Sequence, residues 1–152
     1  MALLHEEITK QIIGAFYAVY NELGYGFVES VYKRALAVEL QARGIAFERE
    51  VMFTVYYLGV DVGDYRADLV VEGKVIVEVK TAERLAPVHE VQVVNYLRAS
   101  NIPVGLLLNY GPQPVFRRLV LAPDRQGDSP HRVDRHRSVV PLDPCKSGSP
   151  SV

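Results

Sequence analysis

Hydrophobic residues recur at intervals of three and four in the first third of the chain, the spacing of helices that bury one face. Residues 5–23 and 27–43 carry this pattern, so we expect two helices there, separated by the turn Gly24-Tyr25-Gly26 and ended by Gly44. The two buried stripes consist of Ile8, Ile12, Ala15, Phe16, Val19 and Leu23, and of Val28, Val31, Tyr32, Ala35, Leu36 and Leu40.

The middle of the chain changes to the alternating, β-branched and aromatic pattern of strands. Residues 47–57 form one such run, and Leu58-Gly59 and Gly63-Asp64 predict breaks after it. Two shorter valine-rich runs, 65–71 and 74–80, are separated by Glu72-Gly73. We therefore expect an antiparallel hairpin over residues 65–80.

The last periodic segments predict a helix and two strands. Pro87 suits the first helical position of residues 87–100, and residues 104–109 and 115–121 are short apolar strands. The resulting order is α-α-β-β-β-α-β-β. It predicts an α/β (α+β) fold in which a central mixed β-sheet is flanked by helices.

Composition supports one globular domain over residues 1–122. The chain has 152 residues, of which 49% are hydrophobic. Residues 123–152 contain five of the nine prolines with Ser, Arg and His and no periodicity, so we expect a flexible tail. The net charge of −1 excludes a strong basic field over the whole molecule.

Cysteine content and hydropathy exclude several classes of protein. The single cysteine, Cys145, excludes intrachain disulfides, cysteine-ligated zinc and a four-cysteine iron–sulfur cluster. No stretch approaches the ~20 apolar residues of a membrane span. The first residues lack the basic and apolar segments of a signal peptide, so we expect a cytoplasmic protein without a membrane partner.

Three charged residues stand inside the valine-rich hairpin. Asp68, Glu78 and Lys80 occupy strand positions where unpaired charge is costly. Two carboxylates with a nearby lysine indicate a metal site with a catalytic cation, and hard oxygen ligands without thiolate favour Mg²⁺ or Mn²⁺. The competing interpretation is a solvated sheet face, but like charges opposite each other are destabilising.

The register of the hairpin decides whether these charges meet. We expect Val70 to pair with Ile76, because alternation then gathers Asp68, Glu78, Arg66 and Lys80 on one face and leaves the other apolar. The expected cross-strand pairs are Val70–Ile76, Asp68–Glu78 and Arg66–Lys80. This register needs a three-residue loop, Glu72-Gly73-Lys74, or a bulge.

Two helices offer further candidates. Glu29 and Tyr32 lie three apart near the start of the second helix, where an acidic residue also favours the helix dipole without any function. On the third helix His89, Gln92 and Tyr96 share a polar, uncharged face. That face could orient the carboxylates or bind phosphate, or be an ordinary half-exposed surface.

These motifs together resemble a known family. The segment Gly26-Phe-Val-Glu29-Ser-Val-Tyr32 is similar to the signature of the GxxExxY proteins, and Asp68, Glu78-Val-Lys80 and Gln92-x-x-x-Tyr96 continue that pattern in order. The GxxExxY family in turn resembles the PD-(D/E)XK nuclease superfamily, especially its RecB-like branch, but this chain lacks the cluster cysteines of some relatives. The resemblance spans about residues 5–121.

The resemblance implies a restriction-endonuclease-like core and a role for each motif residue. Asp68, Glu78 and the Val79 carbonyl would bind Mg²⁺ or Mn²⁺, and Glu29 would complete the metal shell. Lys80 would position or activate the attacking water. Gln92 and Tyr96 would orient the site or touch the nucleic-acid backbone. Tyr32 and His89 are further candidates for binding or orienting the substrate. Without metal, crowding should raise carboxylate pKa values.

The leading hypothesis is a metal-dependent nuclease that hydrolyses nucleic-acid phosphodiester bonds, with DNA the expected substrate. The alternatives are a non-catalytic nucleic-acid-binding or regulatory module that retains the fold, and a Mg²⁺-dependent phosphoesterase for small molecules. A homodimer would be needed to cut both strands of a duplex. The cationic residues that could contact phosphate are Lys33, Arg34, Arg84, Arg98, Arg117 and Arg118.

Overall fold

The computed structural model describes residues 3–121 and confirms the expected order of elements. The predicted tail, residues 123–152, lies outside the described residues. The elements are α1 (Glu6–Leu23), α2 (Glu29–Ala42), β1 (Phe47–Tyr57), β2 (Val60–Val71), β3 (Val75–Lys80), α3 (Pro87–Ser100), β4 (Val104–Tyr110) and β5 (Pro114–Val120). Within residues 3–121, no helix combines the length and hydropathy needed to cross a membrane.

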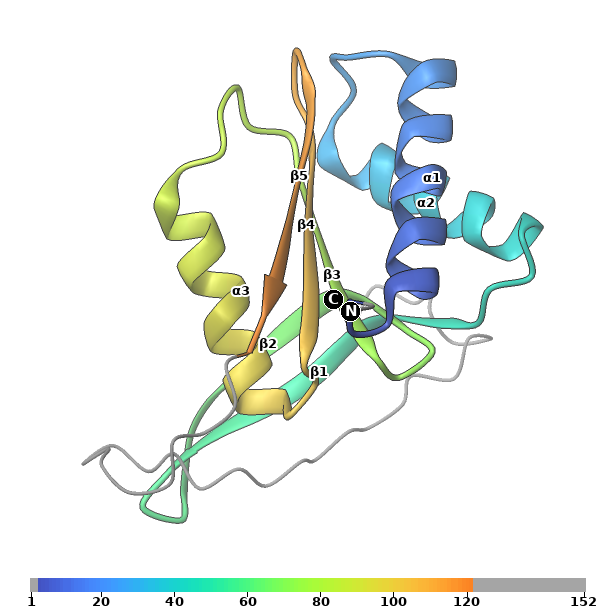
Figure 1. The fold of residues 1–152 in the computed structure, drawn as a ribbon. Coiled ribbons are helices and arrows are strands. Elements are labelled where there is room, and N and C mark those ends of the chain that lie inside the picture. The colour runs from blue at the N-terminus through green and yellow to red at the C-terminus, as the bar shows by residue number, and fades with distance from the viewer. Residues whose placement is uncertain (1–2, 122–152) are drawn as a thin grey trace, which may run out of the picture.

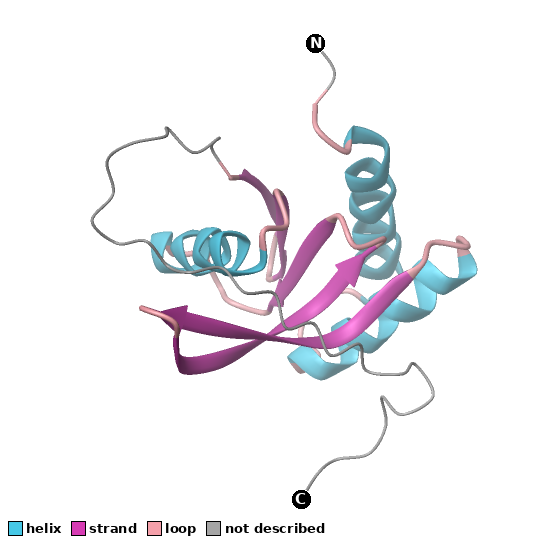
Figure 2. Ribbon diagram, turned by 90° about the horizontal axis from the view of Figure 1, so that it is seen from below, coloured by secondary structure: helices cyan, strands magenta, loops and turns pink. Residues whose placement is uncertain are grey.

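The five strands form one mixed sheet in the order β1-β2-β3-β4-β5. Strands β3 and β4 are parallel, whereas the other neighbours are antiparallel. A parallel pair needs a crossover connection, and α3 provides it. Helices α1 and α2 cover one face of the sheet and α3 covers the other (Figures 1 and 2). The expected central sheet with flanking helices is therefore confirmed.

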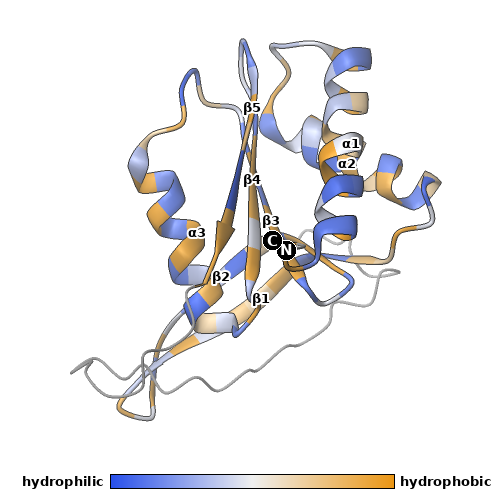
Figure 3. Cartoon of the chain, in the orientation of Figure 1, coloured by the Kyte–Doolittle hydropathy of each residue, from blue (hydrophilic) through white to orange (hydrophobic). Residues whose placement is uncertain are grey.

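Each face of the sheet has its own hydrophobic core. The first core joins α1 and α2 to the inward residues of β3 and β4, including Phe16, Leu36, Val77 and Leu106. The second joins α3 to residues such as Ile76 and Leu107. Hydrophobic residues run along β3 and β4, between the helical layers (Figure 3). Burial on both faces explains why these two strands are almost continuously apolar.

The structure corrects the predicted start of β2. The glycine and aspartate at positions 63 and 64 suggested a break, but β2 begins at Val60 and pairs with β1 around the two-residue turn Leu58-Gly59. Both turn residues have positive φ, 49° and 77°, as in the tight turns that suit a twisted hairpin. Gly63 fits inside the strand because its φ of 150° is tolerated by glycine.

The predicted register of the second hairpin is confirmed, but its ladder is shorter than expected. Val70 pairs with Ile76 and Val71 with Val75, around a loop of residues 72–74. Positive φ at Glu72 and Gly73 allows the Lys74 N–H to donate to the Val71 carbonyl oxygen at 3.0 Å. Cα pairing ends at Leu69 and Val77, so the ladder lacks the predicted pairs Asp68–Glu78 and Arg66–Lys80.

Strict alternation along β2 also fails, at Asp68. Leu69 packs in the α1–α2 core, whereas Ala67, two residues away, packs with Val51 in the α3 core. The pairing of β1 with β2 skips the position between them, where Glu50 has a φ of 51°. At this irregularity the side chains of β2 change the face of the sheet that they enter. It explains why Ala67 is not on the predicted apolar face with Leu69.

Helix α3 lies against β4 at a glycine. A Cβ atom at Gly105 would lie 2.7 Å from Cγ1 of the buried Val93 and 3.3 Å from Leu97. Val93 is β-branched and cannot move aside easily. The absence of a side chain at position 105 therefore fixes how closely α3 approaches the sheet.

We expect Gly105→Ala to lower the free energy of unfolding by about 1–3 kcal/mol through overpacking. Gly14→Ala is the matched control, because a Cβ there meets only the movable guanidinium of Arg43, at 3.0 Å, and alanine favours the helix. Urea denaturation of both variants tests this close packing. An undiminished stability of Gly105→Ala would contradict it.

Candidate active site

Asp68 and Glu78 meet where β2 separates from β3. The Asp68 N–H donates to Glu78 Oε1 at 3.2 Å, and the Val79 N–H donates to Asp68 Oδ2 at 2.8 Å. These bonds replace the backbone ladder, which ends one residue earlier. Both carboxylates are buried, with 9% and 6% of each residue exposed. The structure therefore brings the two predicted carboxylates together in the interior.

The backbone around Asp68 is irregular on both sides. It has left the ladder of β3, and its expected partner on β1, Glu50, lies in the left-handed region of φ. For a non-glycine residue this conformation costs about 1 kcal/mol or more. Asp68 is thus released from ordinary pairing and held by side-chain contacts instead.

Lys33 connects the pair to helix α2. Its Nζ lies 2.8 Å from Asp68 Oδ1 and 3.2 Å from Glu29 Oε2. Glu29 and Lys33 are one helical turn apart, and Glu29 is the more exposed of the two. Glu29 therefore reaches the site through Lys33. The predicted metal role of Glu29 stays a prediction.

Burial and neighbouring charges shift the pKa values of two residues at the site, Glu78 and Lys33. Burial, together with the negative charge of Asp68, raises the pKa of Glu78 to about 8. Burial alone would lower the pKa of Lys33, but its contacts with Asp68 and Glu29 outweigh that effect and raise the pKa. The predicted rise in carboxylate pKa is thus found at Glu78. A cation near Glu78 would favour its ionised form.

Lys80 ends β3 at a firmly held position. It pairs with Asn109 of β4 in the parallel ladder. The buried Asn109 accepts from the Ala82 N–H and donates to the Ala82 carbonyl oxygen, both at 2.9 Å. Gly111 leaves room for this contact, since a Cβ there would lie 2.5 Å from the Ala82 oxygen. The chain beyond Lys80 is therefore tied to β4.

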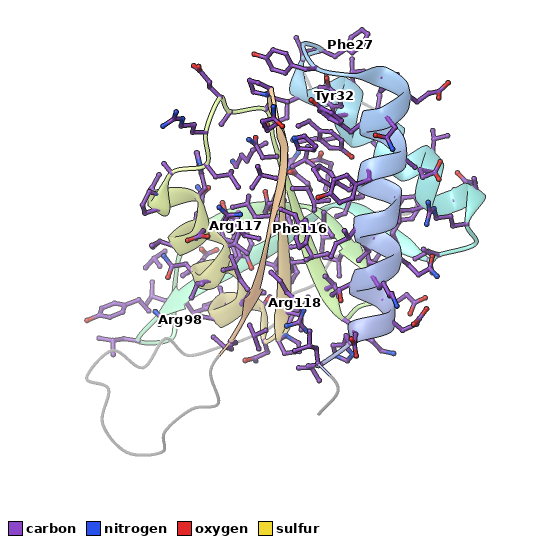
Figure 4. The ribbon with its side chains drawn as sticks, turned by 45° about the horizontal axis from the view of Figure 1, so that its top comes forward. Phe27, Tyr32, Arg98, Phe116, Arg117 and Arg118 are labelled. Carbon is purple, nitrogen blue, oxygen red and sulfur yellow. The ribbon has the colours of Figure 1, made fainter. Side chains whose placement is uncertain are left out.

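Tyr32 fixes the loop that precedes Glu29. It is fully buried, donates its hydroxyl to the Gly24 carbonyl oxygen and accepts from the Phe27 N–H at 3.3 Å. Its ring stacks on Tyr110 at 4.4 Å. Tyr32 and Phe27 lie together at the end of the molecule where α1 joins α2 (Figure 4). The structure thus makes Tyr32 an anchor of this loop and leaves it no exposed surface.

The three candidates on α3 have different surroundings. His89 Nδ1 accepts from the Ala86 N–H at 3.0 Å, so one ring nitrogen caps the start of α3. Gln92 is exposed. Tyr96 stacks on Tyr65 of β2 with ring centroids 4.0 Å apart, and the Tyr65 hydroxyl donates to the Tyr96 carbonyl oxygen. Glu78 contributes to raising the pKa of Tyr96, after burial, which places this ring near the carboxylates.

The donor set fits a hard divalent cation. Asp68 and Glu78 present buried carboxylate oxygens, and Val79 sits beside Asp68 through its N–H. Such oxygens are the usual ligands of Mg²⁺ and Mn²⁺. Across residues 3–121, no three side chains of His, Cys, Asp or Glu gather closely enough to hold an ion between them. Two carboxylates therefore form the centre of the candidate site.

Sequence reasoning missed three contributors to this arrangement. The sequence predicts Lys33 only as one of several cations that could contact phosphate, whereas the structure makes it the ion-pair partner of Asp68. Asn109 was assigned to an apolar strand, and its isolated polarity in that run was the available signal. Tyr65 was assigned only to the hairpin. No local pattern shows that it stacks on Tyr96, which is 31 residues away.

Comparison with known proteins supplies a family description. A family model described as the PD-(D/E)XK nuclease superfamily matches residues 6–119. Among solved structures, the crystal structure of SSO0001 aligns with a TM-score of 0.48 and 22% sequence identity over 79% of this chain. The aligned region spans 61% of the SSO0001 chain. No curated protein sequence gives a significant match.

The raised pKa of Glu78 predicts how metal-free stability depends on pH. The folded protein holds this proton up to about pH 8, whereas the unfolded chain loses it near the ordinary glutamate pKa of 4.5. Between these values the folded state binds more protons, so the free energy of unfolding falls as pH rises. Glu78→Gln should remove most of this fall and stabilise the protein at pH 8 by more than about 1 kcal/mol.

Urea denaturation in EDTA between pH 5 and pH 8 measures this effect. Glu83→Gln, at an exposed position, is the matched control and should keep the wild-type pH dependence. If Glu78→Gln and wild type lose stability in parallel, Glu78 is not the group that titrates.

Proposed function

Because the chain belongs to the PD-(D/E)XK nuclease superfamily, we propose that it is a metal-dependent nuclease that hydrolyses phosphodiester bonds in nucleic acid. The observation that carries this proposal is the buried pair of Asp68 and Glu78. Lys80 follows Glu78 by two residues on the same strand. Within the superfamily we place it with the GxxExxY proteins. Gly26, Glu29 and Tyr32 support that placement, since Tyr32 holds the loop that precedes Glu29.

Asp68 and Glu78 would hold Mg²⁺ or Mn²⁺, with the Val79 carbonyl as a further ligand. Glu29, which contacts Lys33 in the structure, would complete the metal shell only after its carboxylate moves toward the other two. A divalent ion supplies positive charge that offsets the charge developing on the phosphate and favours deprotonation of water. The pKa of Glu78, raised to about 8 by burial and by Asp68, supports a cation site, because such an ion stabilises both carboxylates in their charged forms.

Lys80 would act on the attacking water and the phosphate. It follows Glu78 by two residues, so both side chains leave the same side of β3. The charge of Lys80 lowers the pKa of Glu78 slightly, against the larger effects of burial and Asp68, and this supports a role for Lys80 beside the carboxylates. An ammonium group there can orient water and neutralise phosphate oxygen.

Residues on α2 and α3 would orient this centre. Tyr96, packed on Tyr65, would present its ring toward the carboxylates, whose charges, after burial, contribute to raising its pKa. Gln92 is exposed one turn earlier on α3 and could donate to the nucleic-acid backbone. His89 would act through the start of α3, which it caps, and Tyr32 through the loop before Glu29.

DNA is the proposed substrate, bound through local rather than global positive charge. Arg84 and Arg117 line one surface groove with Asn109, the residue that holds the chain after Lys80. Arg117 also pairs with Glu90 of α3 at 3.3 Å, and its position on β5 is marked in Figure 4. A few such contacts suffice for phosphate binding. Cutting both strands of a duplex would require a homodimer.

We expect purified full-length protein to cleave labelled DNA with Mg²⁺ or Mn²⁺ and to lose cleavage in EDTA. Lys80→Ala should reduce the rate by at least about 100-fold, because it removes the group that acts on water and phosphate. Lys74→Ala is the matched control, since Lys74 lies exposed in the hairpin loop. Single- and double-stranded DNA and RNA are compared in parallel.

Equal rates for Lys80→Ala and wild type would contradict the catalytic role of Lys80. Absence of cleavage with every substrate, despite binding of nucleic acid, would favour a non-catalytic nucleic-acid-binding module. Preferential cleavage of RNA would keep the nuclease and correct its substrate.

A further inference from the structure

The second helix carries a lysine whose position none of the expected roles explains. Lys33 follows Tyr32, which is anchored in the core, and it lies one turn after Glu29. About 23% of its side chain is exposed. A lysine on a helix surface usually extends into water, but this ammonium group lies 2.8 Å from Asp68 Oδ1.

Each carboxylate oxygen of Asp68 has its own partner. Oδ2 accepts from the Val79 N–H, so the backbone of β3 holds that oxygen. Oδ1 faces the ammonium group of Lys33, which also contacts Glu29. Lys33 therefore places a positive charge between the two carboxylates that α2 and β2 contribute to the candidate metal site.

We propose that Lys33 is an internal counter-ion that stabilises the metal-free site and is displaced when a divalent cation binds. This inference rests on the proposed metal site of Asp68, Glu78 and Glu29. A metal bound to Asp68 Oδ1 and Glu29 cannot share those oxygens with an ammonium group at 2.8 and 3.2 Å without strong repulsion. Metal binding thus breaks both ion pairs of Lys33.

The displacement of Lys33 by a divalent cation has two linked consequences. Part of the free energy of metal binding is used to break the contacts of Lys33, so the apparent affinity for metal is lower than the ligands alone would give. In return, the carboxylates are compensated before metal arrives, and the metal-free fold is more stable than it would be with an unpaired Asp68. Lys33 is therefore a positioning residue that sets the metal concentration at which the site fills.

The matched test compares Lys33→Met with Arg34→Met. Both variants remove one positive charge from neighbouring positions of α2, but Arg34 is exposed. The full-length protein is titrated with Mn²⁺, with binding followed by electron paramagnetic resonance of free Mn²⁺. Thermal unfolding is recorded in EDTA and in excess Mn²⁺. Lys33→Gln is prepared in addition, as a polar variant should Lys33→Met fail to fold without metal.

We expect removal of the Lys33 charge to increase Mn²⁺ affinity by at least about tenfold, with less than about twofold change for Arg34→Met. Without metal, Lys33→Met should melt below wild type, and excess Mn²⁺ should raise its melting temperature more than that of wild type. Lys33→Arg keeps a positive charge and should not bind Mn²⁺ more tightly than wild type.

Unchanged or weaker Mn²⁺ binding by Lys33→Met and Lys33→Gln would overturn the displacement of Lys33. Equal gains for Lys33→Met and Arg34→Met would also overturn it, because net charge alone would then explain them. Tighter Mn²⁺ binding without cleavage of any nucleic acid would support the role of Lys33 while rejecting the nuclease. Absence of Mn²⁺ binding by every variant would reject both.

Discussion

The exchange of backbone pairing for side-chain pairing at Asp68 and Glu78 is the interaction on which the site depends. Up to Leu69 and Val77 the two strands form an ordinary antiparallel ladder, and beyond it the carboxylates take over the backbone N–H groups. The separation lets β2 continue with β1 while β3 continues with β4. Burial of these two acidic side chains is stabilised there by backbone N–H donors, by the lysine beside Asp68 and by the proton that Glu78 retains up to about pH 8.

The remaining structure holds this junction in place from both faces of the sheet. On the α1–α2 side, Tyr32 stacks on Tyr110 and fixes the loop before Glu29, so that Lys33 can reach Asp68. On the α3 side, close packing at Gly105 sets the depth of the helix that brings Tyr96 near the carboxylates. The site is thus built on rigid elements, as precise positioning of charged groups requires.

Much of the fold could be predicted because hydrophobic residues recur along the sequence at the regular spacing of helices and strands. The bounds of β1 and α3 agree with the residue ranges expected from the sequence, and the Val70–Ile76 register followed from placing the apolar residues on one face. The early part of β2 was missed because Gly63-Asp64 resembles a turn. The change of face between Leu69 and Ala67 coincides with the irregular backbone of Glu50, on another strand, and no local pattern encodes it.

The chemistry of the site is most directly tested by locating a divalent ion. A crystal structure of the protein grown with Mn²⁺, with anomalous scattering measured near the manganese edge, would show where the ion binds. The nuclease interpretation predicts an anomalous peak in contact with Asp68 and Glu78, with Lys33 moved away from Asp68 Oδ1. Carboxylates that keep their present contacts, with manganese elsewhere or absent, would contradict the assignment of this junction as a metal centre.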